Sequence, residues 1–167
     1  MTAAAPAPDA VALRGRGLGC RYGQGAPVFA GVSLDIGARE IVALLGGSGC
    51  GKSTLLRTLA GLQAPTQGQV EFLGAPLAAP HPRAAVVFQQ PSLLPWLDVA
   101  ANAGFGLGFT HQPRATRSAL QARVQAALEA VGLAGKAHLY PAALSGGMAQ
   151  RVALARALAR EPRLLLA

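Results

Sequence analysis

The chain has 167 residues, long enough to bury a hydrophobic core, and 51% of them are apolar, which excludes a disordered chain. The net charge of +8 would ordinarily raise nucleic acid as a partner. The arginines are scattered and no aromatic residues are interleaved with them, so we expect no nucleic-acid binding. No apolar run reaches the roughly 20 residues of a membrane-spanning helix.

The first part of the chain has the pattern of short strands followed by one helix. Residues 1–10 are rich in Ala and Pro and are predicted to be a frayed tail, with none of the features of a signal peptide. Residues 11–21 have weak strand character, and residues 28–29 and 32–36 are predicted to form further strand pieces. The unbroken apolar run 41–45 is predicted to be a parallel strand covered on both faces. A helix is predicted over residues 54–60, ended by Gly61.

Between that apolar run and that helix lies a phosphate-binding motif. The residues Gly46-Gly47-Ser48-Gly49-Cys50-Gly51-Lys52-Ser53-Thr54 fit G-x-x-x-x-G-K-[ST]. Glycines let successive backbone N–H groups point inward at phosphate oxygens, and the following helix adds the positive end of its dipole. Lys52 is one of only two lysines among fifteen basic residues, which favours a specific need for a compact ammonium. We expect Lys52 to bind the outer phosphates of a nucleotide and the Ser53 hydroxyl to bind Mg²⁺. The alternative, a Gly/Ser linker before a helix, does not account for the flanking pattern.

After a second group of predicted strands, the pattern changes from strands to helix. Residues 69–73 are predicted to be a short strand at an edge of a sheet, and residues 84–88 a buried strand ending at Gln89. Residues 91–110 show no strand pattern. An amphipathic helix is predicted over residues 118–131, with Thr116 or Ser118 as its N-cap and one apolar face of Leu120, Val124, Ala127, Leu128 and Val131.

A second motif starts the last predicted helix, residues 146–160. Its sequence is Leu144-Ser145-Gly146-Gly147-Met148-Ala149-Gln150-Arg151. Ser145 can cap the helix, and bare glycine N–H groups can approach an anion. Taken alone, the stretch is equally compatible with an ordinary capped helix. Placed after a phosphate loop, it closely resembles the signature sequence of ABC-type ATPases.

Further residues agree with this resemblance. Gln89 is similar to the family's Q-loop glutamine, and Tyr22 lies where the family places an aromatic ring under adenine. Residues 164–167 are similar to the start of its Walker B strand. The resemblance implies a P-loop NTPase of the α/β class, with an N-terminal β subdomain and an inserted α-helical subdomain. It divides the chain into residues 1–10 (tail), 11–90 (β and P-loop core), 91–143 (helical subdomain) and 144–167 (signature helix and start of Walker B).

The resemblance also implies a composite nucleotide site. Two such subunits pair head to tail, and each MgATP lies between the phosphate loop of one and the Ser145, Gly146, Gly147 and Gln150 region of the other. Gln89 would touch Mg²⁺ or the attacking water. The implied partners are a second ATPase subunit, a transmembrane permease and, indirectly, a periplasmic or surface binding protein, with the chain on the cytoplasmic face of the membrane. Trp96 lies in the segment that receives the permease in relatives, or alternatively packs inside the helical subdomain.

The family's general base lies in residues that would follow Ala167, so no catalytic residue is assigned here. We expect the seven acidic residues of this chain to be solvated charges, and the chain to be a fragment that binds nucleotide without hydrolysing it.

Within the family, the stretches Phe88–Trp96 and Leu144–Arg151 are most similar to importer ATPases for nitrate, taurine and aliphatic sulfonates. The alternatives are a soluble ABC-type ATPase of repair or translation, a small-molecule kinase, and a non-functional remnant. Repair enzymes carry long coiled-coil insertions, and a kinase would not need the second motif.

Overall fold

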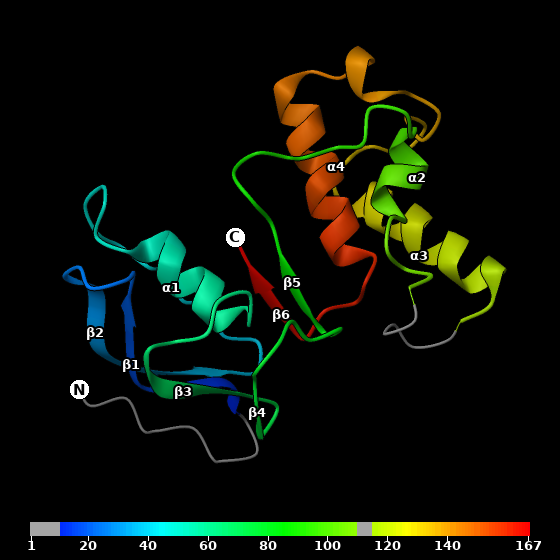
Figure 1. Cartoon of the computed structure of the whole chain (residues 1–167). Coiled ribbons are helices and arrows are strands. Elements are labelled where there is room, and N and C mark those ends of the chain that lie inside the picture. Colours follow the sequence, from blue (N-terminus) through cyan, green and yellow to red (C-terminus); the bar gives the residue numbers. More distant parts are fainter. Residues whose placement is uncertain (1–10, 110–114) are drawn as a thin grey trace. The chain divides into compact units, whose positions relative to one another are not determined.

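The structure is a computed structural model that describes residues 11–109 and 115–167, and these fall into two compact units, Met1–His81 and Pro82–Ala167 (Figure 1). The expected N-terminal tail, residues 1–10, lies outside the described residues. Among the described helices, none is long and apolar enough to cross a membrane.

The first unit is built on an antiparallel sheet with the strand order β2-β1-β3-β4. The long strands β1 (Val11–Arg21) and β2 (Pro27–Gly37) pair along their whole length, with several irregularities in register. β1 therefore confirms the predicted strand, while the two predicted pieces after it form one strand. On the other side of β1 lie β3 (Gln67–Phe72) and the two-residue strand β4 (Ala75–Pro76).

Helix α1 (Lys52–Leu59) belongs to the same unit and buries one face. Its buried residues are Thr54, Leu55, Thr58 and Leu59. Gly61, at a φ of 70°, follows the helix, and a side chain there would collide with the backbone of Ala79, since a Cβ would lie 2.6 Å from its oxygen. The predicted stop at Gly61 is thus confirmed, with the helix starting two residues earlier than predicted.

The second unit packs three helices with a two-stranded parallel ribbon. Strands β5 (Ala84–Val86) and β6 (Leu164–Leu166) pair in parallel, and α4 (Gly146–Leu158) packs between this ribbon and helices α2 (Val99–Ala103) and α3 (Arg117–Ala130) (Figure 1). A short 3₁₀ helix, η2 (Pro141–Ala143), precedes α4. Thr116 caps α3 by accepting a hydrogen bond from the Ala119 N–H, as one of the two predicted caps.

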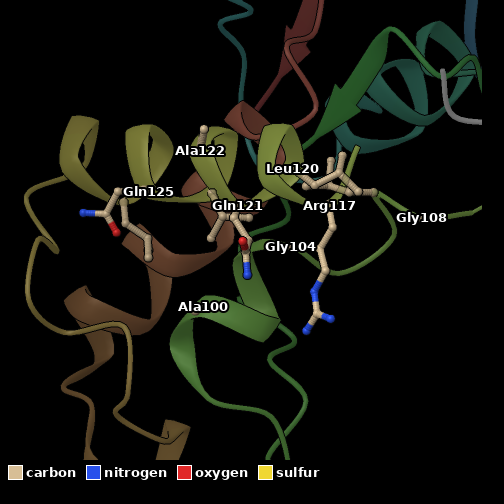
Figure 2. Close-up of a pocket in the computed structure, with 11 residues that line it drawn as sticks. Ala100, Gly104, Gly108, Arg117, Leu120, Gln121, Ala122 and Gln125 are labelled. Carbon is tan, nitrogen blue, oxygen red and sulfur yellow. The ribbon is translucent and has the colours of Figure 1, made fainter. Parts of the chain in front are cut away.

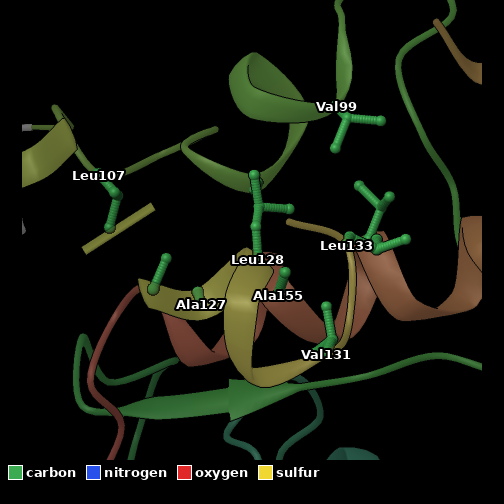
Figure 3. Close-up of a cluster of buried hydrophobic side chains, with 10 residues drawn as sticks. Val99, Leu107, Ala127, Leu128, Val131, Leu133 and Ala155 are labelled. Carbon is green, nitrogen blue, oxygen red and sulfur yellow. The ribbon is translucent and has the colours of Figure 1, made fainter. Parts of the chain in front are cut away.

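The core of the second unit comes from all three helices. Figure 3 shows Leu128 of α3 between Val99 of α2 and Ala155 of α4. Leu107 lies to the left of Leu128 in this view and Leu133 to its right. The predicted apolar face of α3 is confirmed, since Ala127, Leu128 and Val131 are buried and Leu120 and Val124 pack against them. Trp96 is 70% exposed, so the alternative in which it packs inside this unit is wrong.

Two strand predictions are corrected. Residues 41–45 form no strand, and Ile41 and Leu45 are 97% and 88% exposed. A strand requires a hydrogen-bonded neighbour, and no described strand pairs with this run, so its apolar composition alone does not make it one. The second correction concerns β3, which is not an edge strand, because the chain turns at Gly74 and Ala75–Pro76 pairs with Phe72 and Glu71.

Candidate functional site

The glycine bend of the first unit keeps a looped shape even though the run before it is not a strand. The Lys52 ammonium lies across the bend and donates hydrogen bonds to the carbonyl oxygens of Gly46 (2.7 Å) and Gly47 (2.6 Å). Residues 46–50 are exposed. The bend therefore presents its backbone to solvent, with the partly exposed Lys52 ammonium lying across it.

Gly51, at the end of the bend, is needed for its shape. Gly51 has a φ of 91°, in the left-handed region that favours glycine, and it is the N-cap of α1. A Cβ at this position would lie 2.9 Å from Val28 Cγ1 and 3.1 Å from Val28 O. The chain passes so close to β2 here that only glycine fits without a shift of the strand.

The start of α1 is open to an anion. Gly51 has no side chain that could cap the helix, and the first turn contains no acidic residue. The first N–H groups of a helix have no partner inside it, and they carry the positive end of the helix dipole. With Lys52 beside them, these donors fit a phosphate chain, and the exposed Ser53 hydroxyl in the same turn fits a Mg²⁺ ligand.

Two further predicted residues meet beside this helix. Tyr22, directly after β1, is 54% exposed, and its hydroxyl lies 3.5 Å from Thr54 Oγ1 and donates to Gln63 Oε1 at 3.0 Å. Thr54 itself is only 9% exposed. The tyrosine ring is thus held next to α1 with exposed surface available for stacking, and sequence reasoning missed Gln63, which helps to hold it.

The remaining predicted site residues belong to the second unit, and three of them come together there. Gln89, Gly147 and Gln150 line one open hollow of about 460 Å³, with Phe88, Arg151 and Leu154 among its other walls. Ser145 caps α4, since its hydroxyl accepts a hydrogen bond from the Met148 N–H at 3.3 Å. Because α4 begins at Gly146, the two glycines of the signature form its exposed first turn.

The described acidic residues all have partners away from the glycine bend. Asp35 and Glu71 bind arginines of the sheet, Glu40 accepts from the Gly37 N–H, and Asp98 caps α2. Glu129 accepts from Gln125, and Glu161 pairs with Arg123. Asp9 lies outside the described residues. The described ranges hold no cluster of three or more metal-binding side chains, so a bound Mg²⁺ would depend largely on the phosphates and hydroxyls.

The largest of the hollows described here is lined by none of the residues predicted to bind nucleotide. It is an apolar groove of about 600 Å³ between α2 and α3, with Ala100 and Gly104 on one side and Leu120 and Gln121 on the other (Figure 2). Its lining offers the single charged side chain of Arg117 and no arrangement of donors comparable to the start of α1. We therefore do not place the nucleotide site there.

A polar pair of one fully buried and one partly buried side chain was also missed by sequence reasoning. Asn102 of α2 is fully buried and is hydrogen-bonded to Arg156 of α4. The available signal was that Asn102 is the one polar side chain between Val99 and Phe109, in an otherwise apolar and glycine-rich stretch.

Comparison with known proteins agrees with this geometry. Residues 29–167 match the model of the ABC transporter family. Over 139 residues the chain is 52% identical to the aliphatic sulfonates import ATP-binding protein SsuB 2 of Burkholderia lata, which covers 83% of this chain and 48% of that protein. Over 154 residues it is 50% identical to the corresponding protein of Pseudomonas putida, covering 92% of this chain and 53% of the relative. The chain thus spans about half the length of these relatives.

Solved structures show the same fold. The ATP-binding cassette MJ0796, in a dimeric post-hydrolysis state with ADP and Pi, has a TM-score of 0.80 at 30% identity, covering 92% of this chain and 72% of that one. For cbiO1 of Clostridium perfringens, part of the transporter complex cbiONQ, the TM-score is 0.81 at 28% identity, with 93% and 64% covered. With the glycine bend, the capped signature helix and these matches, the fold is the α/β P-loop fold of ABC ATPases, and the chain belongs to the ABC transporter family.

Proposed function

We propose that this chain is the nucleotide-binding part of the ATPase subunit of an ABC importer. The observation that carries the proposal is the glycine bend with Lys52 lying across it, at a helix start that has no side-chain cap. Phosphate oxygens would replace the two carbonyl oxygens as acceptors for the Lys52 ammonium and would receive the free N–H groups of α1. Bound Mg²⁺ would neutralise charge on the phosphates, with Ser53 and Gln89 as its proposed protein ligands.

The proposed site is shared between two copies of the subunit. Ser145, Gly146 and Gly147 form the exposed first turn of α4, with Gln150 one turn further along, and a second copy would bring them to the nucleotide from the opposite side. A second helix start then adds its N–H groups to the same phosphates. The dimeric state of the similar cassette MJ0796 supports this part of the proposal.

The proposed cargo and location follow from the relatives. Both sulfonate relatives share about half of their residues with this chain over the matched region, so we propose an alkanesulfonate as the cargo, with nitrate and taurine as the alternatives. The proposed assembly includes a permease, and a binding protein indirectly, with this subunit at the cytoplasmic face of the membrane. That cbiO1 is part of a transporter complex supports a permease partner.

Residues 1–167 alone should bind nucleotide without appreciable turnover. The six described carboxylates have their hydrogen-bond or ion-pair partners outside the glycine bend, so we assign none of them as the general base for an attacking water. A phosphate-release assay on this chain tests the point, and ordinary ATPase turnover would contradict it.

The decisive experiment compares the only two lysines of the chain. We expect Lys52→Ala to weaken MgATP binding about 100-fold, because two charge-assisted hydrogen bonds contribute about 3 kcal/mol together. Lys136→Ala, an exposed lysine of the other unit, removes the same charge and should leave the affinity within about twofold. Competition against a fluorescent ATP analogue gives both affinities, and equal affinities for the two variants would refute the proposed site.

A further inference from the structure

Asn102 organises the turn that carries Trp96. Its amide oxygen accepts the Leu94 N–H at 2.9 Å, and its amide nitrogen donates to the carbonyl oxygens of Leu94 (3.0 Å), Leu97 (2.8 Å) and Asp98 (3.1 Å). The acceptors and donors around it fix the orientation of the amide, since only the oxygen can face an N–H group. One fully buried side chain thus replaces the backbone partners that an irregular turn lacks.

Arg156 connects this turn to the signature helix. From the last turn of α4, its guanidinium donates to Asn102 Oδ1 (3.0 Å), to the Asn102 carbonyl (3.0 Å) and to the Ser92 carbonyl (3.2 Å). All three acceptors are uncharged, and burial lowers the pKa of Arg156 below its usual value. A partly buried cation without a charged acceptor is costly, which argues that the planar five-donor group is required for these three contacts.

The segment from Ser92 to Asp98, which Asn102 and Arg156 hold and which we call the tied segment, links two of the predicted functional regions. Ser92 lies three residues after Gln89, and Trp96, between Leu94 and Asp98, is 70% exposed. Arg156 holds the segment directly at Ser92 and, through Asn102, at Leu94. Because a helix moves as a rigid rod, a displacement of the α4 start is passed to Arg156, about 15 Å along the same helix.

We propose that Arg156 and Asn102 are positioning residues that lock the segment from Ser92 to Asp98 onto α4, so that the exposed Trp96 surface follows the helix whose first turn carries the signature. The link to nucleotide rests on the proposed function above. The lock itself does not, because it consists of hydrogen bonds between residues of this chain.

The first test measures the lock without nucleotide. Hydrogen exchange of the Leu94 amide reports the bond to Asn102 Oδ1 directly. We expect Arg156→Met to accelerate this exchange about tenfold, and Arg156→Lys to have a smaller effect, since a point-like ammonium cannot span three acceptors. In Asn102→Asp, a carboxylate would face three carbonyl oxygens, and exchange should accelerate at least as much as in Arg156→Met.

The matched control is another arginine of the same helix. Arg151 donates to the carbonyl oxygens of Val131 and Gly132 at the end of α3, not to the tied segment. Arg151→Met should leave the Leu94 amide unchanged and affect exchange near Leu133 instead. Equal acceleration at Leu94 in the Arg151 and Arg156 variants, or none in the Arg156 variants, would overturn the proposal.

The second test asks whether the lock transmits the effect of nucleotide. Trp96 is the only tryptophan, so the emission of the chain reports this segment alone. We expect MgATP to shift Trp96 emission in the unmodified chain. In Arg156→Met, the nucleotide Kd should stay within about twofold while at least half of the shift is lost, which a purely structural role would not produce.

The outcomes separate the two proposals. If the unmodified chain does not bind nucleotide, or if its binding does not depend on Lys52, the proposed function is refuted. The hydrogen-exchange test then decides by itself whether the lock exists. Normal binding with the same emission shift in the unmodified chain and Arg156→Met, or with no shift in either, would refute the transmission and leave the nucleotide site intact.

Discussion

Helices α1 and α4 both start in glycine-containing sequences, but they start in different ways. α4 is capped by Ser145, whose hydroxyl accepts the Met148 N–H. α1 follows a left-handed glycine, Gly51, and has neither a capping side chain nor an acidic residue in its first turn. The uncapped helix is the one with a lysine beside its N–H groups. The difference teaches that similar compositions can leave one helix start satisfied by its own chain and another available for an anion.

The two helices are also held by different means. α4 lies in the middle of a helical core in which Val152 and Ala155 are fully buried. α1 has eight residues and one buried face. An isolated helix of this length is not stable, so we attribute the persistence of α1 to packing and not to its ends.

The largest expected effect tests that attribution. Leu59→Ala on the buried face of α1, where Leu59 is 4% exposed, should lower the free energy of unfolding by about 3 kcal/mol, because it removes buried methyl groups and leaves a cavity. Leu62→Ala, at a side chain just past the helix that is 49% exposed, should cost less than about 1 kcal/mol. Urea unfolding of both variants measures the difference, and similar losses would show that packing does not hold α1.

The next effect tests the shape of the bend. Gly51→Ala should cost about 1–2 kcal/mol, since alanine resists the left-handed conformation, and it should also weaken nucleotide binding because Val28 blocks the new Cβ. Gly47→Ala is the matched control within the same bend. A Cβ on Gly47 meets no atom within 4 Å, so its stability should be unchanged. Comparable thermal stability of the two variants would contradict the structural requirement at Gly51.

A smaller effect tests the capped start of α4. Ser145→Ala should lower the free energy of unfolding by about 1 kcal/mol through the loss of the cap, and Ser145→Gly by only a few tenths. Thr116→Ala, at the cap of α3, should cost a similar amount and serves as the reference. If Ser145→Ala were neutral while Thr116→Ala was not, Ser145 would not stabilise α4 as the structure indicates.

The smallest effect concerns the sheet of the unit that contains α1. The hydrogen bond from Arg16 to Asp35 lowers the pKa of the Asp35 carboxyl, against an opposing effect of burial and with a further contribution from Arg14. Because the pKa of Asp35 is lower in the folded chain than in the unfolded chain, its ionised carboxylate stabilises the fold. This stabilisation is fully present above the unfolded pKa of about 4 and is lost as the pH falls through the folded pKa.

We therefore expect Asp35→Asn to destabilise the chain by less than about 1 kcal/mol at pH 7 and by less still at pH 3. Glu129→Gln, at a carboxylate that accepts from the neutral Gln125, is the control. Urea unfolding at the two pH values gives the difference, and a cost at Asp35 that grew on acidification would contradict the assigned sign.

Local patterns in the sequence determined much of this protein. The spacing of Gly46, Gly51 and Lys52 predicted the bend, the period of Leu120 to Val131 predicted the buried face of α3, and Ser145 predicted the cap of α4. Each of these features depends on residues within a few positions of one another, and turn chemistry, helix periodicity and capping are local properties.

Only the tertiary structure decided the features that depend on distant partners. The apolar runs 41–45 and 164–166 look alike in sequence, yet only the second forms a strand, because Ala84–Val86 lies beside it. Asn102 and Arg156 are 54 residues apart, and the sequence around one does not predict a contact with the other. The contact forms only because α2 and α4 pack together. A strand and a polar pair inside a helical core each require a partner that the local sequence does not contain, which is why the sequence predicted the glycine bend and only the fold revealed the Trp96 turn.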